Sequence, residues 1–433
     1  MTLWNAVFSS GDLGWIAVVS ILSLILFIVG FVLVFFPPTS TGGDPSLWKS
    51  LPLHVAMLTV AWALWIFSLS FAPSIGTVPD VDPNPQAMPS LQEMMAVEDA
   101  KKDESHLYGR GGILGNLNYL AMDGLMPVVG PDLPMFPTKR PHHHLPLLLE
   151  FCFRWCSFMI VVLPLTLLWS RRLTGLRLGL VTVLWSTLVF APVVHAISGD
   201  GWLEEHGAID FSLGLVLLAS GCSALFGVPK YDESQACSGS DGHSATGVLL
   251  MWLGMSLHVS GYSFHADGRA MIALVNMLVG TGCGILIWSF CNSFLWKRPF
   301  TDSTAAGTLA GLAAIAPGAG YMLPQSAIIL GCSSVVLSNI VFHATSLRNP
   351  HDPQRQLFST LGIGSLMGLL GAGMFASSGV GGQRWDEREI LGAIQGNTNQ
   401  LTLQGLAIAA TVMWSVLVTW LLFRLFLPRH ETV

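Results

Sequence analysis

Long apolar segments recur along almost the whole chain, separated by shorter polar stretches. A helix needs about 20 mostly apolar residues to cross the hydrocarbon core of a bilayer. Windowed hydropathy identifies eleven such segments. They cover residues 12–36, 53–75, 147–169, 176–198, 207–227, 244–264, 269–294, 303–322, 324–346, 357–378 and 404–427. The pattern predicts an all-α polytopic membrane protein with eleven transmembrane helices.

Composition supports a chain that lies almost entirely in the membrane. Hydrophobic residues make up 52% of the sequence and charged residues only 11%, which leaves little material for a water-soluble domain. We therefore expect a single membrane domain over residues 1–433. The 45 glycines, many within the apolar segments, would let helix backbones approach closely. The net charge of −6 gives no reason to expect a nucleic-acid partner.

Basic residues predict the orientation, because cytoplasmic loops carry an excess of lysine and arginine. One set of loops, together with the C-terminal tail, contains Lys49, Arg171, Arg172, Arg177, Lys230, Lys297, Arg298, Arg348, Arg355, Arg424 and Arg429. The short loops on the other side contain almost none. We therefore expect the N-terminus outside and the C-terminus in the cytoplasm. No basic residue precedes Lys49, so the first apolar segment is interpreted as a retained span rather than a cleaved signal.

Two segments on the predicted outer side are longer than the other loops. Residues 76–146 are rich in proline and include an acidic patch at Glu93, Glu98 and Asp99, and residues 379–403 carry glycines and mixed charges. Each is interpreted either as a surface loop or as a cap over the bundle. The 76–146 segment is the only candidate for independent folding, and we expect it to be a long extracytoplasmic loop within the one domain.

Several short motifs follow one another in a distinctive order. The fifth span begins with Gly207-Ala208-Ile209-Asp210-Phe211, the fourth ends with Pro192 to His195, and residues 305–317 read AAGTLAGLAAIAP. This order resembles the ammonium transporter family (Amt/Mep/Rh), whose fifth helix begins GALDFAGG and whose eighth contains AGLVAITP. The resemblance covers nearly the whole chain. It implies two inverted five-helix repeats plus an eleventh helix, and a homotrimer with one pore per subunit. It implies no cofactor and no enzymatic activity.

The resemblance also shows where this chain departs from the family pattern. The family's pore contains one histidine on helix five and one on helix ten, which accept and pass a proton. The matching positions here are Leu218 and Leu361. An ion that enters a lumen of this kind loses its hydration, and neither leucine can accept its proton. Proton-coupled ammonium conduction by the family's route should therefore fail, whereas a neutral gas would still be able to cross a dry apolar lumen.

Other positions on the expected substrate path also differ. The helix-six motif GWFGFNAGS is matched by residues 254–262, which include Met255. In this match His258 replaces a gating phenylalanine and Tyr262 replaces a recruitment serine. Ser198 stands where the family has a tryptophan that lines the outer ammonium site. Phe153 matches the other gating phenylalanine and is followed by Arg154, where the family has glutamine.

Polar residues in or near the spans allow more than one interpretation. Asp210 is either a structural residue at a helix N-terminus or an ion ligand. Glu150 and Arg154 are four residues apart on one helix face, so they form a neutral ion pair or place a charge that repels cations. His258 is a structural residue, a shifted proton relay or a cofactor ligand. His142, His143 and His144 belong to a solvated loop or to a metal site.

Two functions remain open at this point. The chain is a transporter or channel for ammonium, ammonia or another small solute, or it is a non-conducting relative. The second kind would be an accessory subunit of a larger membrane assembly with other membrane subunits, or a ligand sensor. The sequence contains no nucleophile triad, phosphate loop or metal-ligand cluster, so an enzyme is not expected.

Overall fold

The structure is a computed structural model. It describes residues 10–35, 45–75, 111–126, 145–226, 241–346, 353–381 and 389–427, together with two short strands, β1 (Val128–Val129) and β2 (Pro134–Met135), which pair antiparallel. The acidic patch near Glu93, the three histidines at 142–144 and Trp385 lie outside the described residues.

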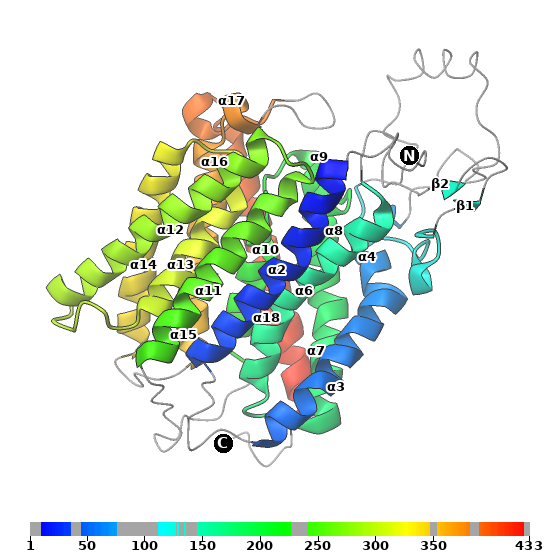
Figure 1. Ribbon diagram of the computed structural model, residues 1–433, viewed down its shortest axis with the longest axis horizontal. Coiled ribbons are helices and arrows are strands. Elements are labelled where there is room, and N and C mark those ends of the chain that lie inside the picture. Colours follow the sequence, from blue (N-terminus) through cyan, green and yellow to red (C-terminus); the bar gives the residue numbers. More distant parts are fainter. Residues whose placement is uncertain are drawn as a thin grey trace.

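A helix coincides with each of the eleven predicted segments, and together these helices form one bundle (Figure 1). Several are composite, because short turns of another helix type interrupt them or follow their ends. In chain order they are α2 (Ser10–Phe35), α3 with η1 and α4 (Pro45–Phe71), α6 (Leu147–Trp169), α7 with η4 and α8 (Gly175–Ser198), α10 (Gly214–Ser223), α11 (Asp241–Ser260), α12 (Gly268–Phe294), α13 with η7 (Thr304–Gly318), α14 (Pro324–Ser346), α15 with η8 and α16 (Pro353–Phe375) and α18 (Asn399–Phe426).

Within the described residues, eight of these helices are long and apolar enough to cross a membrane, and α11 is not among them. Two others are shorter than their predicted spans: α10 covers only Gly214–Ser223 of 207–227, and α13 with η7 covers Thr304–Gly318 of 303–322. Irregular backbone stands where helix was predicted, before Gly214 in the first case and after Gly318 in the second. Hydropathy alone does not distinguish buried irregular backbone from helix, because both are apolar.

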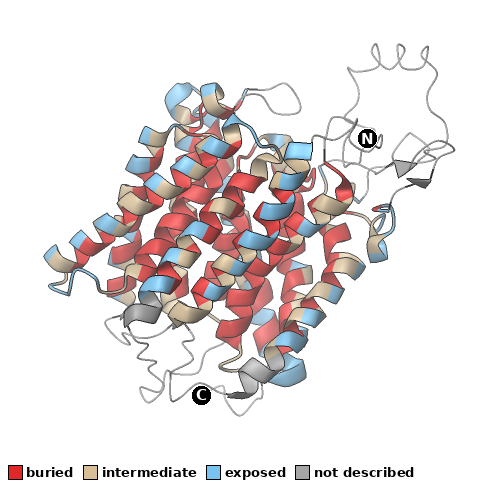
Figure 2. Cartoon of the chain, viewed as in Figure 1, coloured by how far each residue is buried: buried red, intermediate tan, exposed pale blue. Residues whose placement is uncertain are grey.

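The most deeply buried of the long apolar helices is α6. In its most apolar stretch 83% of residues are buried, against 33% for α2 and 39% for both α12 and α18. Figure 2 shows the same arrangement, with buried residues inside the bundle and exposed ones along the outer helices. α2 packs along α11 and α6, and α12 packs along α14 and α13. The side chains of α6 therefore face other helices on nearly all sides.

Two irregular segments meet near one end of the bundle. The N–H group of Phe211 donates to the carbonyl of Pro317 over 2.8 Å, which joins the stretch before α10 to the end of α13. Gln404 of α18 accepts from the Ile209 N–H and donates to the Ile209 carbonyl, at 3.0 and 2.6 Å. Asn276 of α12 donates to the carbonyls of Ala319 and Met322. Buried backbone outside a helix needs such partners, and these side chains supply them.

Two helices contain a π-helical turn whose origin is visible in the sequence. In η4 (Ser186–Phe190) the following Pro192 has no N–H to donate to the Leu188 carbonyl, and the Trp414 indole donates to that carbonyl instead, at 2.7 Å. In η8 (Phe358–Gly362) the hydroxyls of Ser359 and Thr360 bond back to carbonyls four residues earlier, both at 2.7 Å. Bonds of this kind bend helices and loosen their regular pattern.

Glycine permits backbone contact between α10 and η8 at the level of the expected pore. A Cβ atom on Gly221 would lie only 2.3 Å from the Gly362 nitrogen, so any larger residue would force the two helices apart. Leu361 and Leu218 lie beside this contact in sequence and belong to the same apolar core cluster.

Candidate functional site

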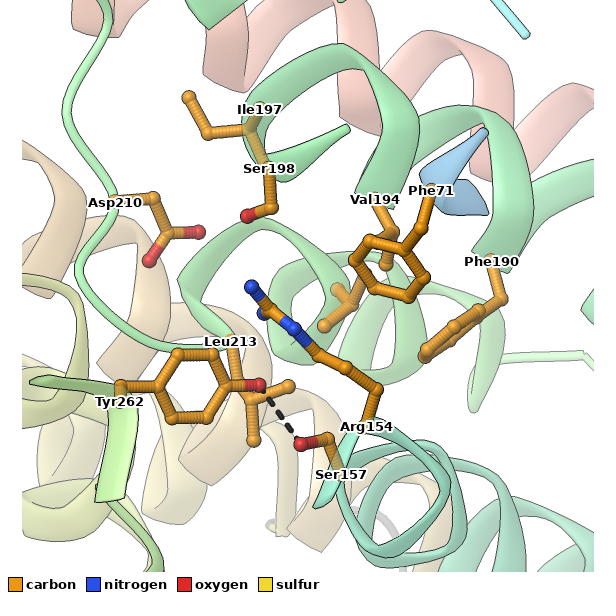
Figure 3. Close-up of a pocket in the computed structure, with 11 residues that line it drawn as sticks. Phe71, Arg154, Ser157, Phe190, Val194, Ile197, Ser198, Asp210, Leu213 and Tyr262 are labelled. Atoms are coloured by element: carbon orange, nitrogen blue, oxygen red, sulfur yellow. Dashed lines mark hydrogen bonds between the residues drawn. The ribbon is translucent and has the colours of Figure 1, made fainter. Parts of the chain in front are cut away.

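A small pocket lies at the end of the bundle where the irregular segment before α10 meets α6 and α8. Its cavity volume is about 20 Å³, which is room for about one water molecule. Its lining residues are Phe71, Arg154, Ser157, Phe190, Val194, Ile197, Ser198, Asp210, Leu213, Val216 and Tyr262 (Figure 3). The pocket thus combines aromatic and aliphatic walls with a few polar groups, as ligand sites commonly do.

The Arg154 side chain reaches from α6 into this pocket, and its end group points toward Ser198 and Asp210 (Figure 3). Its Cζ atom lies 4.7 Å from the ring centre of Phe71, 5.1 Å from that of Tyr262 and 4.9 Å from that of Phe264. All three distances are within the range of about 6 Å for a cation–π interaction. One guanidinium group is therefore surrounded by three aromatic rings.

Glu150 provides the counter-charge for this arginine. The Arg154 Nε atom lies 3.5 Å from Glu150 Oε1, and both side chains are almost fully buried. The spacing of four residues left two interpretations open, a neutral ion pair or a charge that repels cations, and the structure contains the ion pair. Burial and, to a smaller extent, the Glu150 carboxylate raise the pKa of Tyr119, in the loop outside α6, to about 12. The Tyr119 phenol therefore stays uncharged at neutral pH.

Asp210 lies on the wall of the pocket, four residues before α10, and its side chain caps the start of that helix. Its two carboxylate oxygens accept from the backbone N–H groups of Gly214 and Leu215, at 2.9 and 2.8 Å. The exposed N–H groups of a helix N-terminus favour an acidic side chain at this place. Leu213, immediately before the helix, has a left-handed backbone with φ +61°. α10 therefore cannot continue backward through residue 213, which explains why it is shorter than predicted.

A chain of side-chain hydrogen bonds leads away from the pocket into the bundle. The Tyr262 hydroxyl donates to Ser157 Oγ at 3.0 Å, Ser157 Oγ pairs with His258 Nε2 at 2.9 Å, and His258 Nδ1 pairs with Ser23 Oγ at 3.0 Å. The His258 ring stacks on Phe153, with ring centres 4.8 Å apart. Both ring nitrogens have a hydroxyl partner, which suits a neutral histidine and accounts for its complete burial.

The eight residues predicted to line the substrate path fall into three places. Ser198, Asp210 and Tyr262 line the pocket. Phe153 and His258 lie directly behind Tyr262, since both rings contact it edge to face. The remaining three are buried elsewhere in the apolar core and are not among the lining residues: Leu218, Met255 and Leu361.

Three important residues of this site were not predicted from the sequence. Ser157 links Tyr262 to His258, and its spacing of four residues from Phe153 on α6 was a usable signal. Phe71 and Phe264 complete the rings around Arg154. They come from α4 and from the turn after α11, so only the folded chain brings them together. Among the described residues, no group of three histidine, cysteine or acidic side chains is placed to hold a metal ion.

Comparisons with known proteins agree on the kind of protein this is. The profile of the Ammonium Transporter Family matches residues 134–427. An ammonium transporter of Bacillus subtilis is 26% identical over 389 residues, which cover 87% of this chain and 83% of the relative. The crystal structure of Saccharomyces cerevisiae Mep2 superposes with a TM-score of 0.74 at 23% identity and covers 97% of this chain and 86% of that chain. A structure described as a sensor Amt protein superposes with a TM-score of 0.71 at 15% identity, covering 96% and 92%.

The matched profile covers well over half of the sequence, and the helical bundle has the fold of the solved Amt and Mep structures. The expected resemblance is therefore confirmed. This integral membrane protein belongs to the Ammonium Transporter Family and, like the family, is not an enzyme.

Proposed function

We propose that this protein has the architecture of an ammonium transporter but does not conduct ammonium by a proton-coupled route. The reasoning starts from the cost of taking an ammonium ion out of water. In an apolar lumen that ion needs either a base to take its proton or polar groups to replace its hydration. At the two positions where the family resemblance places histidines, this chain has Leu218 and Leu361.

The proposal rests on the burial of these two leucines in the hydrophobic core. Leu218 is 1% exposed and Leu361 is 7% exposed, and both lie within the main apolar core. Beside them α10 and η8 are in backbone contact through Gly221 and Gly362. An aliphatic side chain offers neither a proton acceptor nor a hydrogen bond. A neutral molecule such as ammonia would meet a much smaller barrier there than ammonium.

The architecture around this lumen is proposed from the family and the charge distribution. We infer a single membrane domain over residues 1–433, eleven membrane crossings, and an extracytoplasmic loop at 76–146 within that domain. The N-terminus lies outside and the C-terminus in the cytoplasm, according to the basic residues of the loops. The chain assembles as a homotrimer in the bilayer.

A second candidate is a non-conducting role as a ligand sensor or as an accessory subunit beside other membrane proteins. The buried arginine favours it, because the Arg154 side chain, paired with Glu150, reaches into the pocket that an entering cation would have to pass. The likeness to a solved protein that is described as a sensor is compatible with this role. Purification at native expression levels would reveal any accompanying subunits.

Reconstitution into liposomes tests the proposal directly. A jump in ammonium concentration should give no electrogenic current with the wild-type protein. The ammonium transporter of Bacillus subtilis, reconstituted in the same lipid, is the positive control. The double variant Leu218→His with Leu361→His asks whether the histidine pair alone restores conduction, and continued silence would favour the accessory or sensor role. A current with the wild-type protein that scales with ammonium would refute the proposal.

A further inference from the structure

Two long helices, α12 and α14, lie side by side at one edge of the bundle and touch through their backbones (Figure 1). A Cβ atom on Gly331 of α14 would lie only 2.2 Å from the Gly280 carbonyl oxygen of α12, and one on Gly284 would lie 2.9 Å from the Val335 side chain. Glycines of this kind allow helices in a membrane to approach closely. Side chains beside the contact are therefore brought within reach of the opposite helix.

Each of the two helices contributes one cysteine at this contact. Cys283 lies between Gly280 and Gly284 on α12, and Cys332 directly follows Gly331 on α14. A side-chain hydrogen bond joins the two thiol groups, and both residues are half-buried. Cysteines can form a disulfide bond when their Cα atoms are about 4.4–6.8 Å apart, and backbone contact between helices brings neighbouring residues to such separations. We therefore expect side-chain rotation alone to bring the two sulfurs into bonding distance.

The other cysteines of the described segments are arranged differently. Cys152 and Cys156 are four residues apart on α6. Cβ atoms at that spacing on one helix are about 5–6 Å apart, whereas a disulfide needs a separation of about 3.5–4.5 Å. Cys222 and Cys291 are buried within the bundle. Cys283 and Cys332 are thus the pair of described cysteines best placed to form a disulfide.

We propose that Cys283 and Cys332 are an oxidation site, at which an alkyl hydroperoxide joins α12 to α14 through a reversible disulfide. Both cysteines lie within apolar spans, so the oxidant must be uncharged and able to enter an apolar phase. In the first step one sulfur takes the terminal oxygen of the hydroperoxide, which gives a sulfenic acid and releases the alcohol. The second sulfur then bonds to the first, and the sulfenic oxygen leaves as water with the hydrogen of the second thiol. The two thiols together give up two hydrogen atoms, and the hydroperoxide is reduced to one alcohol and one water.

The disulfide links exposure to peroxide with the packing of helices beside the expected pore. α14 packs against α16 and η8 as well as α12, and η8 contains Leu361. A covalent bond to α12 fixes the position of α14 at the glycine contact, and it restricts the unfolded chain, which raises the thermal midpoint. This proposal concerns the outer helices of the repeat and is independent of what crosses the lumen.

The test treats purified full-length protein in detergent micelles with tert-butyl hydroperoxide, blocks the remaining thiols with N-ethylmaleimide and identifies disulfides by mass spectrometry. The wild-type protein should lose two of its seven thiols and give a peptide pair joined through Cys283 and Cys332, which dithiothreitol separates. Its thermal midpoint should rise on oxidation and return on reduction. Cys283→Ser and Cys332→Ser should each abolish the disulfide and the rise, and stop at a sulfenic acid that dimedone labels. Cys291→Ser, also on α12, is the matched control and should retain both.

Two results would overturn the proposal. One is a folded wild-type protein that keeps all its thiols under hydroperoxide, even if copper phenanthroline cross-links the pair, because closeness without this reaction does not make an oxidation site. The other is a disulfide that joins different cysteines. If a serine variant does not fold, Cys283→Ala and Cys332→Ala add no hydroxyl to the apolar contact and answer the same question. Ammonium currents in liposomes decide the proposed function separately, so the two ideas fail through different measurements.

Discussion

The outer pocket and the centre of the bundle differ in how they treat polar groups. At the pocket, Arg154, Asp210 and Tyr262 are buried or half-buried, and each has partners supplied by the chain itself. Leu218 and Leu361 belong to the main hydrophobic cluster, and Gly221 and Gly362 bring α10 and η8 into backbone contact. Both regions are stable for the same reason, since neither leaves a charge without compensation. They differ in that charged and polar side chains line the pocket, whereas the two positions in the bundle centre are leucines.

Breaking the ion pair in the pocket should have the largest effect. Arg154→Leu removes the cation 3.5 Å from the buried Glu150 carboxylate, and removal of one partner from a buried pair costs about 3–5 kcal/mol of unfolding free energy. The double variant Glu150→Leu with Arg154→Leu should lose less, because the carboxylate is removed together with its cation. Denaturation in mixed micelles followed by circular dichroism measures both. Equal stability of the single and double variants would mean that Glu150 takes its compensation from elsewhere.

The helices were largely predictable from the sequence, whereas the aromatic rings around Arg154 were not. Length and hydropathy located α6, α12 and α14 almost to the residue, because a membrane span is a local property of the chain. The Glu150–Arg154 pair was predictable for the same reason, since four residues along a helix define one face. Phe71 and Phe264 are 193 positions apart by their numbers, and no local pattern relates them to Arg154.

The family resemblance found part of the site that local patterns could not. It pointed to Ser198, Asp210 and Tyr262, and these three do line one pocket. Hydropathy, by contrast, predicted a span from residue 207, whereas the helix begins at Gly214. The left-handed backbone of Leu213 explains the difference. A conformation that tertiary contacts impose on leucine cannot be inferred from its hydrophobicity.

At the centre of the bundle, the corresponding test is to add a single methyl group. Gly221→Ala places a Cβ atom 2.3 Å from the Gly362 nitrogen, and backbone cannot turn aside as a side chain does. We expect a loss of about 3 kcal/mol, the upper part of the usual range for overpacking. Gly14→Ala is the control, because a Cβ atom on that α2 residue would have no neighbour within 4 Å. A tolerated Gly221→Ala would show that α10 and η8 can separate.

A third variant tests whether the hydrogen bonds from Gln404 of α18 hold the backbone of the pocket wall in place. Gln404→Leu removes the partner of both the N–H and the carbonyl of Ile209, one residue before Asp210. Buried groups left unsatisfied cost about 2 kcal/mol, and the pocket wall should loosen with them. Thermal unfolding measures the first effect. The second is a loss of near-ultraviolet circular dichroism from the aromatic rings that line the pocket. Gln400 donates to the Gly207 carbonyl and accepts from the Asn397 side chain. Neither bond involves Ile209, so Gln400→Leu should have a smaller effect on both.

The smallest expected effect is that of the Glu150 charge on the pKa of Tyr119, which lies outside the pocket. Tyr119 has an ordinary pKa of 10.0 that burial, and then Glu150, raise to about 12. The folded protein thus keeps a proton that the unfolded chain loses, so the stability from this group is complete below about pH 10 and is lost as pH rises toward about 12. Phenolate absorbance, with Tyr119→Phe subtracted, reports the titration. Glu150→Gln should lower the pKa of Tyr119 but leave it above 10.0, because burial remains the larger cause. An unchanged titration would mean that the positive charge of Arg154 already cancels the electrostatic effect of Glu150 on Tyr119.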